Sequence, residues 1–168
     1  MADILCAAFN RIQTTGWTMA KVYIPVGSVS GTATAVAEAC ADALRAAGHE
    51  AQTDSAASIE ALNSGAWDAV LIVTSTTGRG DLPSNLAPFY TALGEQRPAQ
   101  NGRPFGVISL GDSSYDATFC NGGALMEDRF YELEGQAPVP RVTIDATETQ
   151  TPDVDAIFWL NEWMEKAF

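Results

Sequence analysis

The fold of this chain follows from residues 22–33, which read Val-Tyr-Ile-Pro-Val-Gly-Ser-Val-Ser-Gly-Thr-Ala. The first five residues form a short apolar run typical of a buried strand, and residues 34–47 repeat apolar side chains at helical spacing. Unpaired N–H groups at a helix N-terminus, together with the helix dipole, form a site for an anion. A strand, a small-residue turn and a helix start therefore predict a phosphate-binding turn. The alternative is a simple turn whose Ser or Thr only caps the helix.

Length and charge limit the class of protein. The chain has 168 residues, which favours a single domain, and its net charge is −12. From Asp112 onward there are twelve acidic and three basic residues. This charge argues against nucleic acid as a partner and favours a basic protein, with a solvated acidic face as the alternative. No apolar run approaches the roughly 18 residues of a membrane span, so we expect no membrane insertion.

The cysteines and the histidine indicate no metal site. Cys6, Cys40 and Cys120 form no CxxC pair, and the single histidine, His49, cannot complete a metal cluster. A reducing, cytoplasmic location fits this pattern. His49 follows Gly48 at an expected helix end, so we predict an exposed turn histidine.

The N-terminal segment differs from the rest of the chain. Residues 1–18 precede Met19 and the first expected strand. We interpret them as a disordered N-terminal extension or as a start assigned upstream in error. The domain itself is expected to span residues 19–168.

Apolar runs alternate with segments of helical periodicity along the chain. The clearest strand, residues 68–74, is apolar on both faces, as in a parallel sheet covered by helices. The alternation predicts an α/β, doubly wound parallel sheet of five strands with helices on both faces. The expected strands are 22–26, 49–53, 68–74, 105–110 and 140–144. The expected helices are 34–47, 58–62, a helix capped by Ser84 or Asn85 and ending near Gly94, 124–133 and 153–167, the last packing through Phe158, Trp159, Trp163 and Met164.

Three loops rich in Gly, Ser and Thr follow the carboxyl ends of the strongest expected strands. They comprise residues 27–33, 75–83 and 110–120. In doubly wound sheets, ligands bind outside these strand ends, where the strand order reverses. Loops of small polar residues suit a planar polar ligand with a phosphate tail, held by backbone groups and flanked by Tyr115.

The three loops resemble the motifs of the flavodoxin family, most closely its MioC-type branch. The motifs are Gly-Ser-Val-Ser-Gly-Thr-Ala at 27–33, Ser-Thr-Thr-Gly-Arg-Gly-Asp-Leu-Pro-Ser-Asn at 75–85, and Gly-Asp-Ser-Ser-Tyr at 111–115 with Phe119-Cys120. The resemblance covers residues 20–168. It implies a short-chain member with strand order 2-1-3-4-5 and FMN as cofactor.

The resemblance also implies which residues bind FMN. Residues 28–33 would wrap the phosphate, residues 76–80 would border the flavin at N5, and Tyr115 would stack on the ring. Residues 118–120 would offer backbone groups to the pyrimidine end, and Asp145 would approach the ring or ribityl chain. The full implied set is Ser28, Val29, Ser30, Gly31, Thr32, Ala33, Ser75, Thr76, Thr77, Gly78, Arg79, Gly80, Leu110, Gly111, Asp112, Tyr115, Thr118, Phe119, Cys120 and Asp145.

The same residues bear on the redox potential. In the family, a peptide beside the flavin turns over so that its carbonyl accepts the N5–H of the one-electron form, and Gly78-Arg79 matches that peptide. The phosphate loop contains no Lys or Arg. The phosphate charge would therefore be met by neutral donors, and Asp112, Asp116 and Asp145 would further disfavour reduced anionic flavin, which makes a strong reductant.

Four positions depart from the family pattern. Thr77 replaces an aromatic ring found in many members, and Arg79 brings a positive charge towards the flavin. Three residues separate Tyr115 from Phe119, one more than in the commonest pattern, which would displace the contacts after Tyr115. Pro25 lies in an interior strand, where we expect a bulge.

The resemblance implies a monomeric FMN-bound electron carrier rather than an enzyme. Such a carrier would shuttle single electrons from a basic reductase, of the flavodoxin or ferredoxin reductase kind, to a basic acceptor enzyme. Two alternatives remain open from the sequence. One is a flavin-dependent NAD(P)H:quinone reductase, and the other is a flavin-free regulatory module on the same fold.

Overall fold

Five parallel strands form one sheet in the order β2-β1-β3-β4-β5. The computed structural model describes residues 19–168, with the backbone but not the side chains of residues 115–117. The interpretation of residues 1–18 lies outside the described residues. The sheet confirms the predicted strand order and places β1 between β2 and β3. The strands are β1 (Lys21–Gly27), β2 (Glu50–Asp54), β3 (Ala69–Thr74), β4 (Phe105–Gly111) and β5 (Val142–Asp145).

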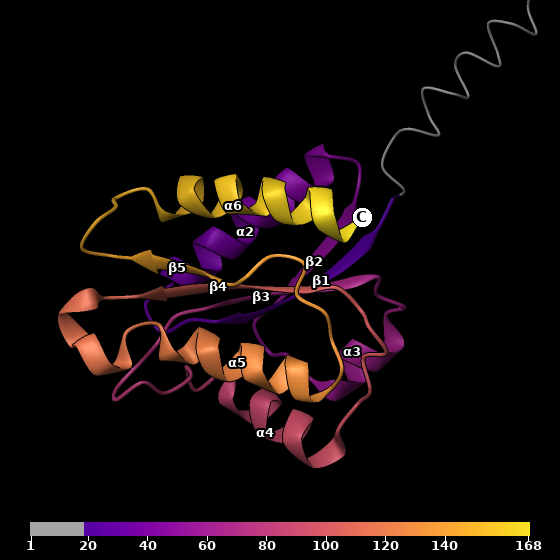
Figure 1. Cartoon of the computed structure of the whole chain (residues 1–168), viewed down its shortest axis with the longest axis horizontal. Coiled ribbons are helices and arrows are strands. Elements are labelled where there is room, and N and C mark those ends of the chain that lie inside the picture. Colours follow the sequence, from indigo (N-terminus) through magenta and orange to yellow (C-terminus); the bar gives the residue numbers. More distant parts are fainter. Residues whose placement is uncertain (1–18) are drawn as a thin grey trace, which may run out of the picture.

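Helices cover both faces of the sheet, as predicted (Figure 1). The helices α2 and α6 lie on one face, and α3, α4 and α5 lie on the other. All six residues of β3 are buried, because each face of this central strand packs against a helical layer. The helices are α2 (Thr32–Ala46), α3 (Ile59–Ser64), α4 (Ala87–Gln96), α5 (Asn121–Glu132) and α6 (Pro152–Ala167), with a 3₁₀ helix η1 (Ser113–Thr118) before α5.

Neither of the residues expected to cap α4 does so. The helix begins at Ala87, and its N-cap is Leu86, which makes no side-chain capping bond. The amide of Asn85 instead donates to the carbonyls of Val26 (2.9 Å) and Ser55 (3.0 Å). The prediction for Asn85 is wrong because its side chain bonds to backbone groups distant in the sequence instead of capping the helix.

The last helix packs through a different set of aromatic residues than predicted. Phe158 is 83% exposed, whereas Trp159 and Trp163 are buried against the sheet. Consecutive residues on an α-helix point about 100° apart, so a face centred on Trp159 and Trp163 turns Phe158 outward. The inclusion of Phe158 in the packing face is therefore wrong, while that of Trp159, Trp163 and Met164 is confirmed.

Pro25 lies where the ladder between β1 and β3 is interrupted, and no bulge accompanies the interruption. Val22 and Tyr23 pair with Ala69 and Val70 of β3, and pairing resumes at Val26. The register is the same on both sides of the interruption, so no extra residue is inserted and the expected bulge is absent from β1. Proline has no N–H to donate, and the sheet tolerates one missing bond between two well-paired segments.

His49 is buried, contrary to the expected exposed turn. Its side chain is 4% exposed, and its Nδ1 accepts a hydrogen bond from the amide of Ala20 (3.1 Å). The ring centre lies 4.8 Å from that of Phe168 at the end of the chain. Burial lowers the pKa of His49 below its ordinary value of 6.5. The prediction failed because packing against the C-terminus covers a residue that its local sequence places in a turn.

Replacing His49 with Asn is expected to remove a pH dependence of stability. Unfolded His49 gains a proton below about pH 6.5 while the folded, buried ring resists it, so the free energy of unfolding falls as the pH drops. The slope is at most about 1.4 kcal/mol per pH unit. Urea unfolding between pH 7.5 and 5 measures this, and the Asn amide oxygen still accepts from Ala20. An equal slope in both proteins would show that His49 is not the titrating group.

Two further properties concern the described residues alone. No helix within residues 19–168 combines the length and hydropathy that crossing a bilayer requires. Within the same range, the His, Cys, Asp and Glu side chains do not gather in a group of three that could hold a metal ion.

Candidate functional site

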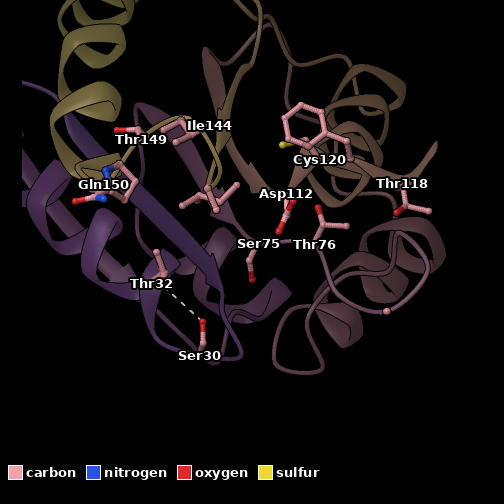
Figure 2. Close-up of a pocket in the computed structure, with 16 residues that line it drawn as sticks. Ser30, Thr32, Ser75, Thr76, Asp112, Thr118, Cys120, Ile144, Thr149 and Gln150 are labelled. Atoms are coloured by element: carbon pink, nitrogen blue, oxygen red, sulfur yellow. Dashed lines mark hydrogen bonds between the residues drawn. The ribbon is translucent and has the colours of Figure 1, made fainter. Parts of the chain in front are cut away.

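A cavity of about 680 Å³ opens at the carboxyl ends of the strands (Figure 2). This volume falls within the roughly 300–1,000 Å³ typical of cofactor sites. The cavity lies where the strand order reverses. The chain runs from β1 to β2 on one side of the sheet and then crosses to β3 on the other side of β1. Its lining comes from the ends of β4 and β5, from the loops after β1, β3, β4 and β5, and from the first residues of α2 and α6: Ser30, Thr32, Ser75, Thr76, Gly78, Leu110, Gly111, Asp112, Thr118, Phe119, Cys120, Ile144, Ala146, Thr149, Gln150 and Pro152.

One end of the cavity is the start of α2. The N-cap Gly31 has φ of 93°, which favours glycine, and no side chain caps the first turn. The hydroxyls of Ser30 and Thr32 lie 3.5 Å apart and line the cavity (Figure 2). The simple capped turn is therefore not what the structure contains. Amides at an uncapped helix start beside two hydroxyls have the chemistry to bind an anion.

Ser28 stabilises the turn from within. Its Oγ accepts a hydrogen bond from the amide of Gly31 (3.0 Å), and its own amide donates to Oδ1 of Asn85 (3.1 Å). Asn85 thus joins the turn at residues 27–33 to the loop that follows β3. Sequence reasoning read Asn85 as a helix cap and missed this role, which no local signal could have shown.

The loop after β3 forms a tight hairpin, here called the 76–81 hairpin. Thr77 and Asp81 exchange two backbone hydrogen bonds of 2.8 Å each. Gly78 and Gly80 adopt φ of 54° and 90°, which side chains rarely permit. Gly78 lines the cavity, and Arg79 is exposed at the apex. The hairpin therefore presents a glycine backbone, rather than a charged side chain, to the cavity.

Cys120 closes the third loop and has a structural thiol. Its Sγ donates to the carbonyl of Ser109 (3.3 Å), and Ser109 Oγ donates to the carbonyl of Cys120 (2.9 Å). Burial raises the pKa of Cys120, so the group stays a thiol. A Cβ on Gly111 would lie 2.8 Å from the Cys120 amide, so only glycine permits this close approach. The predicted stacking residue, Tyr115, lies here, but its side chain is outside the described part.

Asp145 holds the outer wall of the site. Its carboxylate accepts hydrogen bonds from the Thr147 amide (2.9 Å) and hydroxyl (2.8 Å) and from the Ser113 amide (3.2 Å). The Ser113 side chain, followed by the amide and hydroxyl of Thr147 and the Ser113 amide, favours the charged carboxylate and lowers the pKa of Asp145 to about 2. Among the described residues that line the cavity, its neighbours Ile144 and Ala146 are present and Asp145 is not. The carboxylate thus ties the loop after β5 to η1.

The structure brings more than half of the predicted site residues to one cavity. Those that line it are Ser30, Thr32, Ser75, Thr76, Gly78, Leu110, Gly111, Asp112, Thr118, Phe119 and Cys120. Those placed beside it, outside the described lining, are Ser28, Val29, Gly31, Ala33, Thr77, Arg79, Gly80 and Asp145.

The loop after β5 supplies a wall of the cavity that the sequence reasoning missed. This wall consists of Ile144 near the end of β5, of Ala146, Thr149 and Gln150 in the loop, and of Pro152 at the start of α6. The signal was present, since the last expected strand ends at the same edge of the sheet as the other parallel strands. The loop was nevertheless left out of the predicted lining because it lacks the glycines that mark the other three loops.

The charge of the cavity is negative. Asp112 is the only ionisable acid or base, apart from the buried thiol of Cys120, among the described lining residues. Neither Lys nor Arg belongs to that lining. An anionic ligand here is met by amides and hydroxyls, with no opposite charge in contact.

Comparison with known proteins identifies the family. The family model described as Flavodoxin matches residues 24–159. Flavodoxin YqcA of Escherichia coli K12 is 35% identical over 145 residues, which are 86% of this chain and 97% of that protein. Protein MioC of the same strain is 35% identical over 147 residues, 87% of this chain and 97% of that protein.

A solved structure agrees with these relatives. A cysteine-to-serine mutant of flavodoxin from Pseudomonas aeruginosa superposes with a TM-score of 0.84 at 48% identity, covering 88% of this chain and 98% of that one. Both the sequence and the fold thus match along nearly the whole described chain. The protein is therefore a short-chain member of the flavodoxin family, of MioC and YqcA type, and this is a family of FMN-type electron carriers.

Proposed function

We propose that this protein is an FMN-bound carrier that accepts single electrons from a reductase and passes them to acceptor enzymes. One observation carries the proposal. The cavity combines an uncapped helix start with two hydroxyls at one end and a glycine hairpin at another. The first suits a phosphate, and the second allows backbone to approach a planar ring.

The residues present fit FMN. Ser30, Thr32 and the first amides of α2 would hold the phosphate, and the 76–81 hairpin would border the ring. Residues 118–120 would offer backbone groups at the pyrimidine end. Stacking by Tyr115 stays a prediction. When bound, FMN supplies storage for one or two electrons, and the protein sets which states are favoured.

The charges support a strong reductant with a basic partner. Neutral donors leave the phosphate charge largely uncompensated, and Asp112 adds a negative charge to the cavity wall. Arg79 is exposed and has no ion pair among the described residues, so its charge stays with solvent. The excess of acidic residues after Asp112 favours encounter with a basic surface on a reductase or acceptor.

We further propose that the protein works as a cytoplasmic monomer. Cys40 and Cys120, the described cysteines, are both buried thiols, which fits a reducing compartment. Size-exclusion chromatography of the purified protein with light scattering tests the monomer.

Added FMN is expected to raise the melting temperature of the apoprotein, and the purified protein is expected to be yellow. A ligand at 100 times its Kd stabilises the folded state by about 2.7 kcal/mol. Thermal unfolding with and without FMN measures the shift. A colourless protein indifferent to FMN would support a flavin-free module. Steady NAD(P)H oxidation without added reductase would support a quinone reductase instead.

A further inference from the structure

The first turn of α5 holds the 76–81 hairpin from outside the cavity. Asn121 Nδ2 donates a hydrogen bond of 2.7 Å to the carbonyl of Gly80, and the Gly122 amide donates to Thr76 Oγ1 at 3.1 Å. Asn121 itself is not among the described residues that line the cavity. Both ends of the hairpin are thus tied to one rigid helix.

The contact between the hairpin and α5 is close on both sides. Gly80 has φ of 90°, and a Cβ on it would lie 3.1 Å from Asn121 Nδ2. A Cβ on Gly122 would lie 2.8 Å from the carbonyl oxygen of Ser75. Glycine at both positions lets the backbones of the hairpin and α5 approach closely. The hydrogen bond from Asn121 to Gly80 then joins the two segments.

The apex of the hairpin is left out of these bonds. Thr77 and Asp81 pair below it, and Asn121 holds Gly80 at its side. Among the described residues, which leave out the side chains of residues 115–117, no hydrogen bond involves the carbonyl of Gly78 or the amide of Arg79. Rotation of the Gly78–Arg79 peptide would break none of these described bonds, and the Thr77–Asp81 pair below it would stay in place.

We propose that Asn121 is a positioning residue for electron transfer, acting through the Gly80 carbonyl to fix the frame from which the Gly78–Arg79 peptide reaches the flavin. This inference rests on the proposed function. A hairpin that is already held in place loses less conformational entropy when the Gly78–Arg79 peptide adopts its flavin-bound orientation. The effect of one neutral hydrogen bond on such an equilibrium is about five-fold.

The test compares Asn121→Ala with Asn161→Ala, a matched change at an exposed position of α6. In the apoprotein, amide hydrogen exchange at Gly80 and Asp81 is expected to become about five-fold faster in the Asn121 variant alone. In the FMN-loaded protein, the first one-electron midpoint potential is expected to fall by about 40 mV, since 59 mV corresponds to tenfold for one electron. The ratio of FMN to riboflavin affinity should not change, because the phosphate end is elsewhere.

Several results would overturn the proposal. Unchanged exchange and potential in the Asn121 variant would show that the bond does not hold the hairpin. Faster exchange with an unchanged potential would reduce Asn121 to a structural role. If the wild-type apoprotein does not bind FMN, the proposed function fails and this role fails with it, while the exchange measurement still reports whether the bond holds the hairpin. If alanine prevents folding, Asn121→Ser keeps a polar residue at the helix start but cannot reach Gly80.

Discussion

Replacing Thr32 with Glu is expected to weaken FMN binding by about 100-fold while leaving riboflavin binding nearly unchanged. The reason is that a carboxylate at the start of α2 would occupy the place of the phosphate and repel it. Two like charges 4 Å apart cost about 4 kcal/mol near a protein surface, and exposure of Thr32 reduces this through solvent screening. Isothermal titration of the apoprotein with each ligand measures both affinities.

Thr32→Gln is the matched control for this variant. Glutamine has the length of glutamate without its charge, so FMN affinity should fall by about tenfold, which is the low end of the cost of one lost hydroxyl bond to a charged group because Thr32 is exposed. The fold should tolerate either change. The first turn of α2 contains no acidic residue, and a carboxylate there interacts favourably with the helix dipole. Equal weakening of FMN and riboflavin by glutamate would place Thr32 at another part of the ligand.

Replacing Trp163 with Ala is expected to lower the free energy of unfolding by about 3–5 kcal/mol. Trp163 is fully buried, its Nε1 donates to the carbonyl of Phe105 (3.1 Å), and its ring packs over Gly106, where a Cβ would lie 2.6 Å from Nε1. Alanine would leave a cavity between α6 and β4 and an unpaired carbonyl. Because α6 begins at the cavity wall with Pro152, FMN binding should weaken as well.

Phe158→Ala provides the control in the same helix. This aromatic side chain is 83% exposed, so its removal should change the free energy of unfolding by less than about 0.5 kcal/mol. Urea unfolding followed by circular dichroism measures both variants. A similar loss in the two would contradict the packing of α6 described above.

The sheet and its helices were predictable because their signals are local. The strands β1, β3 and β4 are short apolar runs, so the expected strands at 68–74 and 105–110 closely match β3 (Ala69–Thr74) and β4 (Phe105–Gly111). The cavity could be placed for a related reason. Parallel strands bring their carboxyl ends to one edge, so loops far apart in the sequence meet there.

Single side chains were harder to predict than elements. His49 has the sequence neighbours of a surface turn, yet Phe168 covers it from the far end of the chain. Asn85 has the position of a helix cap, yet its amide bonds Val26 and Ser55. In each case a partner more than 25 residues away supplies the deciding contact.

The sequence by itself determined the fold class, the strand order implied by the family, and three of the loops that line the cavity, because periodicity and small-residue turns act over a few neighbouring residues. Only the tertiary structure decided that Asn85 ties the turn after β1 to the loop after β3, that the segment after β5 forms a wall, and that Asn121 holds Gly80. Hydrogen bonds between side chain and backbone depend on distances of about 3 Å. Such distances exist only after separate elements have packed together.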